Sequence, residues 1–189
     1  KTVTRLSYKE KLIYDIIKED IVVYNAHTNL DLAIGGVNHI LAKTLGIKNT
    51  EPLKIMYEEP THGYGRIGEI EETPLLDYLA KVKKGLKTEH LLVYGDINRT
   101  IKKVAVCGGS GSSFIYDAYL KGAQIYITGD VKYHEAQYAN ELGLTIIDGG
   151  HYNTEKLILP VIKKYLEEKI SETIDIQLYN ESSPPYTVY

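Results

Sequence analysis

The chain has 189 residues, of which 43% are hydrophobic and 25% are charged, and its formal net charge is −3. This composition argues against disorder and against a general nucleic-acid binder, which carries a basic excess; because no run of about 18 apolar residues occurs, we also expect no membrane span. The single cysteine, Cys107, excludes an internal disulfide and a cysteine-based zinc finger, so we expect a reducing, cytoplasmic compartment.

In the first half of the chain, the hydrophobic spacing alternates between the helical and the extended period. Ser7 followed by Glu10 predicts a helix start with a capping box, and Gly46 is a stop signal after a helical stripe. The predicted elements are a helix from Ser7 to Ile17, a strand at 21–26, a helix at 35–45, strands at 53–59 and 64–72 around a Pro60/Gly63 turn, a helix from Thr73-Pro74 and a short strand at 90–94.

In the second half, the pattern becomes regular. Strands are predicted at 104–106, 124–128 and 144–147, a loop at 108–113, helices at 114–120, 131–142 and 154–169, and a final strand at 173–179. Strands that alternate with helices indicate crossover units, so we expect an α/β fold with mainly parallel strands.

Residues 148–155 follow a predicted strand and begin a helix. His151 and Glu155 are four residues apart, so on a helix they project from one face, about 5–6 Å apart at Cβ. An imidazole and a carboxylate at this spacing suit one divalent cation, and ligands of open α/β sheets bind beyond the carboxyl ends of the strands. The alternative is a capped helix start with a surface His–Glu pair.

Two further segments place polar residues just after predicted strands. In the first, Asp31 can supply a carboxylate to the same metal, with His27 beside it, although on spacing alone helix capping by Asn29 or Asp31 is the better explanation of the segment. In the second, Asp130 is a natural N-cap, and His134 can exchange a proton with a bound ligand or be a solvated helix residue.

The glycine- and serine-rich segment 108–113 lies between a predicted strand and helix. Free backbone amides at such a helix start favour anions, but the segment is neither a Walker loop nor a full dinucleotide fingerprint. A phosphate cradle and a plain tight turn are both compatible with it, and Cys107 before it reads as a buried small residue.

Five segments in order carry a resemblance to a known family. They are HTNLD with GGVN at 27–38, GRIGE at 65–69, the stretch 104–113, ITGDVKYHE at 127–135 and IDGGHYNTE at 147–155. Together they resemble the GTP cyclohydrolase 1 type 2 homolog family, also called Nif-three-like proteins, from the first helix to about Lys164.

The resemblance implies two α/β lobes, with a metal site in the cleft between them, and a ring-shaped homohexamer. Residues 1–47 and 150–189 would form lobe one, and residues 48–149 lobe two. Each subunit would hold two divalent ions (zinc, manganese, iron or nickel). The implied metal ligands are Asp31, His151 and Glu155, and the residues that line the cleft are His27, Asp130 and His134.

One feature departs from the family. Its paired His-His ligand motif, which lies before the first helix, does not occur in this sequence. We therefore expect the chain to be an N-terminally incomplete member whose three ligands are only part of a two-metal shell.

The functional expectation is a dimetal hydrolase-type enzyme that acts on a nucleotide-like or heterocyclic small molecule, with His134 as a catalytic proton carrier. The family name implies ring opening of GTP. The alternative is a metal-binding scaffold or regulatory protein without turnover. A third hypothesis is a phosphate- or nucleotide-binding module built on residues 108–113.

Overall fold

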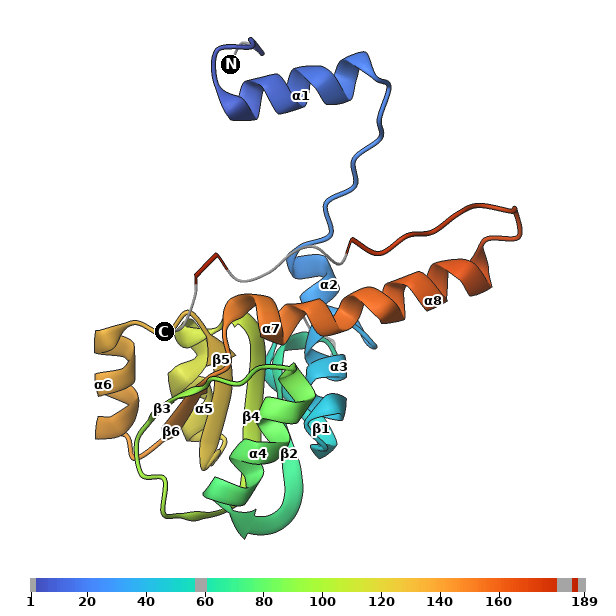
Figure 1. The fold of residues 1–189 in the computed structure, drawn as a ribbon. Coiled ribbons are helices and arrows are strands. Elements are labelled where there is room, and N and C mark those ends of the chain that lie inside the picture. Colours follow the sequence, from blue (N-terminus) through green and yellow to red (C-terminus); the bar gives the residue numbers. More distant parts are fainter. Residues whose placement is uncertain (1–2, 57–60, 180–184, 187–189) are drawn as a thin grey trace.

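A six-stranded sheet forms the centre of the computed structural model, which describes residues 3–56, 61–179 and 185–186 (Figure 1). The strand order is β1-β2-β4-β5-β6-β3. The strands are β1 (Lys48–Ile55), β2 (Gly63–Pro74), β3 (Leu92–Tyr94), β4 (Thr100–Ser110), β5 (Ile125–Gly129) and β6 (Thr145–Asp148).

The sheet is mixed rather than mainly parallel. The pairs β4–β5 and β5–β6 are parallel, whereas β1–β2, β2–β4 and β3–β6 are antiparallel. Crossover helices, which parallel neighbours require, connect only β4 to β5 and β5 to β6. The prediction of a parallel sheet is therefore confirmed for the central strands and wrong for the flanking ones.

Helices cover both faces of the sheet. Strand β4 shows the division, because Val104 and Val106 pack in one hydrophobic cluster and Ala105 and Cys107 in the other. The first cluster is covered by α3 (Val37–Thr44) and α4 (Leu75–Leu86), and the second by α5 (Ile115–Leu120) and α6 (Tyr133–Glu141). All four helices were expected from the sequence.

Two predicted strands are absent from the described residues. Residues 21–26 and 173–179 form neither helix nor strand. Val22 and Tyr24 are largely exposed, because no neighbouring strand in the described chain pairs with this segment. Strand β1 begins earlier than predicted and ends at Ile55, and residues 57–59 of the predicted strand, with Pro60 of the predicted turn, lie outside the described residues.

The first helix, α1 (Tyr8–Lys18), lies apart from the sheet and its covering helices (Figure 1). Ser7 caps it as predicted, and its hydroxyl accepts a hydrogen bond from the Glu10 amide at 3.3 Å, but the Glu10 side chain accepts from the Thr4 hydroxyl and does not complete the predicted capping box. No α1 residue is buried. The sheet falls entirely within residues 48–149, and the two-lobe division of the chain stays a prediction.

No helix in the described part of the chain is both long enough and apolar enough to cross a membrane. The cytoplasmic location stays a prediction.

A buried arginine anchors the packing of α3 against the sheet. Arg66 of β2 is 1% exposed, and its Nη2 lies 3.0 Å from His39 Nδ1. Because a guanidinium can only donate, Nδ1 accepts in this contact, which requires a neutral imidazole. Burial, followed by the charge of Arg66, lowers the pKa of His39 from its usual 6.5. The Ala33 carbonyl oxygen also lies 3.2 Å from Nδ1 and partly offsets this lowering of the His39 pKa.

The lowered pKa predicts a pH-dependent contribution of His39 to stability. The pKa of His39 is lower in the folded protein than its value of 6.5 in the unfolded chain. Its full contribution to the stability of the fold is therefore present above pH 6.5 and is lost as the pH falls through the folded-state pKa. His39→Gln keeps an acceptor for Arg66 but does not titrate. We expect the free energy of unfolding, measured by urea titration between about pH 8 and pH 5, to fall more steeply in the wild type than in His39→Gln. Parallel curves would contradict the assignment.

Candidate metal centre

The candidate site lies at the carboxyl ends of the parallel strands. Strand β6 leads through Asp148 and two glycines into α7 (His151–Glu155), which sits beside the ends of β4 and β5. The approach is close: a Cβ on Gly129, the last residue of β5, would lie 2.5 Å from the His151 amide nitrogen. Glycine at 129 is therefore required for α7 to start here.

His151 and Glu155 project together, as their spacing predicted. His151 Nε2 lies 3.3 Å from Glu155 Oε1, and His151 Nδ1 lies 2.7 Å from Asp130 Oδ2. Burial by itself lowers the pKa of His151, but the hydrogen bond to Asp130 and the charges of Glu155, Asp130 and Asp31 outweigh it and raise the pKa. The two ring nitrogens thus have distinct environments.

The contact with Asp130 orients the imidazole in the manner of a metal ligand. Histidines that bind metals commonly donate their second N–H to a carboxylate, which leaves the other nitrogen free for the ion. Here Nδ1 faces Asp130 and Nε2 faces Glu155, so a divalent ion that displaces the Nε2 proton would meet both the imidazole and the Glu155 carboxylate.

The expected N-cap role of Asp130 is wrong. The N-cap of α6 is Lys132, whose amide donates to Glu135 Oε2 at 2.7 Å, while Asp130 adopts a left-handed backbone conformation with φ 56°. Asp148 supports this turn, because its carboxylate accepts hydrogen bonds from the amides of Val131 (2.9 Å) and Gly150 (2.8 Å). Asp148 therefore stabilises both the turn that carries Asp130 and the turn that leads into His151.

Two side chains bind consecutive amides at the end of β4. The Gly108 amide donates to Asn38 Oδ1 and the Gly109 amide to Thr154 Oγ1, each at 2.9 Å. Asn38 and Thr154 are buried. Asn38 Nδ2 also donates to the backbone oxygen of Asp31 at 3.1 Å. The segment with Asp31 and the helix with His151 are thus fastened to neighbouring residues of one strand.

These contacts count against a phosphate cradle at 108–113. The amides of Gly108, Gly109 and Gly111 donate to Asn38, Thr154 and Thr128 respectively, so they are not free for an anion. The plain structural reading of this segment is the better one. Cys107 is buried as expected, and burial raises the pKa of its thiol to about 12, which makes it a poor nucleophile.

Asp31 lies on α2 (Thr28–Leu32), a short helix whose N-cap is His27. The alternative in which Asn29 or Asp31 caps the following helix is wrong, because Gly36 is the N-cap of α3 and the Asn29 side chain accepts a hydrogen bond from the His27 amide. Within the described residues, the Asp31 carboxylate accepts no hydrogen bond and forms no ion pair. It remains available to a ligand.

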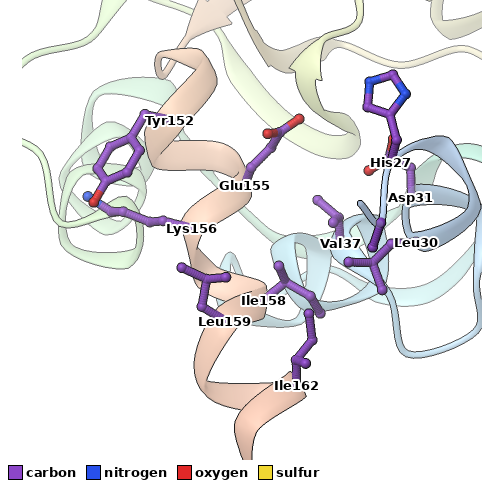
Figure 2. A pocket seen from close by; sticks show the side chains of 11 residues that line it. His27, Leu30, Asp31, Val37, Tyr152, Glu155, Lys156, Ile158, Leu159 and Ile162 are labelled. Carbon is purple, nitrogen blue, oxygen red and sulfur yellow. The ribbon is translucent and has the colours of Figure 1, made fainter. Parts of the chain in front are cut away.

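A pocket of about 320 Å³ separates the two groups of candidate residues. His27 and Asp31 line one side, and Glu155 projects from the facing helix (Figure 2). Burial raises the pKa of both carboxyl groups; nearby histidine charge offsets this shift in each, and the charge of Asp31 raises the pKa of Glu155 further. Two half-buried carboxylates that disfavour each other's ionisation form a site that a cation would stabilise.

The structure brings the candidate residues near one another without closing them around an ion. In the described parts of the chain, no three His, Cys, Asp or Glu side chains are arranged to hold a metal as they stand.

His134 is exposed on α6, and its ring packs edge-on against Tyr133 at 5.2 Å between centroids. It has no described contact with Asp31, His151 or Glu155.

The donor set fits a divalent cation. It combines two carboxylates and one oriented imidazole, which suit zinc and the later first-row metals. Gly109 lies next to two of these donor atoms: a Cβ there would clash with Glu155 Oε1 and approach His151 Nε2 to 3.2 Å. Glycine at 109 therefore leaves room at the two donor atoms.

Sequence reasoning missed the residues that hold this arrangement together. Asn38 and Thr154 are small polar residues within helical segments, and only the fold shows that their partners are amides of Gly108 and Gly109. Asp148 carried a usable signal, because a carboxylate that follows three buried strand residues must find hydrogen-bond donors.

The hydrogen bond from the Gly109 amide to the Thr154 hydroxyl can be tested by substitution. In Thr154→Val the shape is kept but the Gly109 amide loses its acceptor, which should cost about 1–3 kcal/mol of stability. Thr154→Ser keeps the hydroxyl and loses only a buried methyl group. We expect hydrogen exchange of the Gly109 amide, measured by NMR, to accelerate markedly in Thr154→Val and to stay protected in Thr154→Ser. Equal protection in both variants would contradict the proposed anchor.

Comparison with known proteins identifies the family. The chain matches the sequence model of Duf34/NIF3 (NGG1p interacting factor 3) over residues 1–185. A Clostridium perfringens protein named GTP cyclohydrolase 1 type 2 homolog is 33% identical over 186 residues, covering 98% of this chain and 71% of that protein. A Streptococcus pneumoniae protein of the same name is 37% identical, covering 94% and 69%.

The fold gives the same result. The crystal structure of a Bacillus cereus protein related to NIF3 superposes with a TM-score of 0.83 at 28% identity, covering 89% of this chain and 73% of that one. The resemblance inferred from the five sequence segments is thereby confirmed. The chain belongs to the DUF34/NIF3 family.

Proposed function

We propose that this protein binds divalent metal ions through Asp31, His151 and Glu155 and acts as a metal-dependent hydrolase-type enzyme. The observation that supports the proposal best is the orientation of His151: Asp130 holds its Nδ1, and its Nε2 faces Glu155. The free carboxylate of Asp31 lies across the same pocket. Zinc, manganese, iron and nickel all suit these donors.

The three ligands leave coordination positions for other groups. We propose two ions in each subunit, as the family resemblance implies, with the remaining positions taken by water, by substrate, or by residues in the part of the relatives' length that this chain does not span. A divalent ion bound here would polarise a substrate oxygen and lower the pKa of a bound water.

The protein's own residues would prepare this chemistry in distinct ways. Asp130 would keep His151 in the tautomer that presents Nε2. Glu155 and Asp31 would neutralise cationic charge from opposite sides of the pocket. His134, on the first turn of α6, stays our candidate for protonating a leaving group.

Metal content tests the ligand assignment. We expect the wild type to retain zinc or manganese through gel filtration, and His151→Ala, Glu155→Gln and Asp31→Asn each to lose it, because each removes one donor. Asp130→Asn should weaken metal affinity about 10–100-fold, as loss of a ligand's hydrogen-bond partner typically does. His90→Ala, at another exposed histidine, is the matched control. Retention of metal by all three ligand variants, measured by mass spectrometry, would refute the assignment.

For the reaction, we propose ring opening of a nucleotide or related heterocycle, the class suggested by the name of the relatives. The expected result is formate release from GTP or a heterocyclic analogue that a chelator abolishes and added metal restores. His134→Ala should slow turnover while leaving metal content unchanged. Stoichiometric metal without product from any nucleotide or heterocycle would instead favour the second candidate function, a metal-binding scaffold or regulatory protein.

We also propose a homo-oligomer, and specifically the homohexamer that the resemblance implies. Exposed apolar side chains on and after α1, among them Leu12, Ile17 and Val22, support self-association, because such patches mark interaction surfaces. Light scattering coupled to size exclusion should give the mass of six chains. A monomer at all concentrations would contradict the proposal.

A further inference from the structure

The pocket beside the candidate metal centre has walls of two kinds. At one end it is bounded by Asp31 and Glu155, which are the proposed metal ligands. The rest of the lining is largely apolar and comes from α2, α3 and the helices that follow Glu155: Leu30, Val37, Ile158, Leu159 and Ile162 (Figure 2). A metal end and an apolar end therefore share one cavity.

We propose that this pocket is the substrate subsite and that it takes a small ligand with a planar apolar body and one metal-coordinating oxygen group, without a triphosphate. The inference rests on the proposed metal function and narrows its substrate class from a nucleotide or related heterocycle to the heterocycle, so product is expected from a heterocyclic analogue and not from GTP. A pocket of about 320 Å³ is at the small end of ligand sites, which suits a single ring system rather than a complete nucleoside triphosphate.

The charges of the lining favour the same conclusion. A triphosphate needs several cationic or amide donors, and the only lysine among the described lining residues is Lys156. Its ammonium already donates to Asn153 Oδ1 at 2.9 Å and lies 4.9 Å from the centroid of the Tyr152 ring. Lys156 and Tyr152 project away from the side on which His27 and Asp31 lie (Figure 2).

Nearby backbone donors do not replace the missing cations. The amides of Gly108, Gly109 and Gly111 are bound to side chains of the protein. With metal ions bound, the charge of Asp31 and Glu155 is neutralised, and the ions themselves are the remaining partners for an anionic group at this end. The ligand group at this end is therefore one that coordinates metal, and the ring extends toward Leu159 and Ile162.

Two hydroxamates that differ only in the ring test the proposal. Benzohydroxamate and acetohydroxamate carry the same metal-binding group, and only the first has a planar apolar body. Calorimetric titration of the zinc-loaded protein should show at least about ten-fold tighter binding of benzohydroxamate, because its ring leaves water for an apolar wall. This advantage should fall several-fold in Leu159→Ser and Ile162→Ser. Leu120→Ser, at another exposed helical leucine, should preserve it, and GTP should not displace benzohydroxamate at equal concentration.

Each other outcome has a definite meaning. Equal affinity for the two hydroxamates, or an advantage that survives in both Leu159→Ser and Ile162→Ser, would overturn the apolar subsite while leaving the metal centre intact. Displacement by GTP would overturn the exclusion of a triphosphate. Failure of both hydroxamates to bind to protein that retains zinc would overturn the subsite, because no coordination position of the metal would then face the pocket; failure of the protein to retain zinc would overturn the proposed metal function.

Discussion

Two consecutive backbone amides at the end of β4 hold the candidate site together. Asn38 accepts a hydrogen bond from the Gly108 amide through Oδ1 and donates one to the backbone oxygen of Asp31 through Nδ2. Thr154, on the helix that carries His151 and Glu155, accepts a hydrogen bond from the Gly109 amide. All of these groups are largely withdrawn from water, so an unmade bond here would be costly. Residues more than a hundred positions apart in the sequence are therefore brought to the two sides of one pocket by a single strand end.

The electrostatics of the site follow from this anchoring. Asp31 and Glu155 are partly buried, and burial raises the pKa of both. His151 is fixed by Asp130, which Asp148 in turn supports by holding the turns on either side. When two carboxyl groups are held near each other, the charge of one makes ionisation of the other less favourable. A bound divalent cation removes this repulsion. The apolar side chains that continue the pocket give the same cavity a second, water-excluding part.

The sequence predicted the elements better than their partners. The helices beside the sheet and the strands β4 to β6 were found from hydrophobic periodicity and glycine signals, and the spacing of His151 and Glu155 correctly placed them on one face. The segment at 21–26 reads as a strand locally but has no described partner, because strand formation depends on a neighbour that periodicity does not reveal. The side chain of Asp130 illustrates the same limit: its type suggested a helix cap, and only the fold turns it toward His151.

The most direct test of the account is anomalous diffraction from crystals of the zinc-loaded protein, recorded on both sides of the zinc absorption edge. The account predicts a strong peak in the pocket between Glu155 and Asp31, within about 2.0–2.2 Å of His151 Nε2 and a carboxylate oxygen, with His151 Nδ1 still bound to Asp130. Zinc peaks confined to other surface histidines, with Asp31 and Glu155 unchanged, would contradict it.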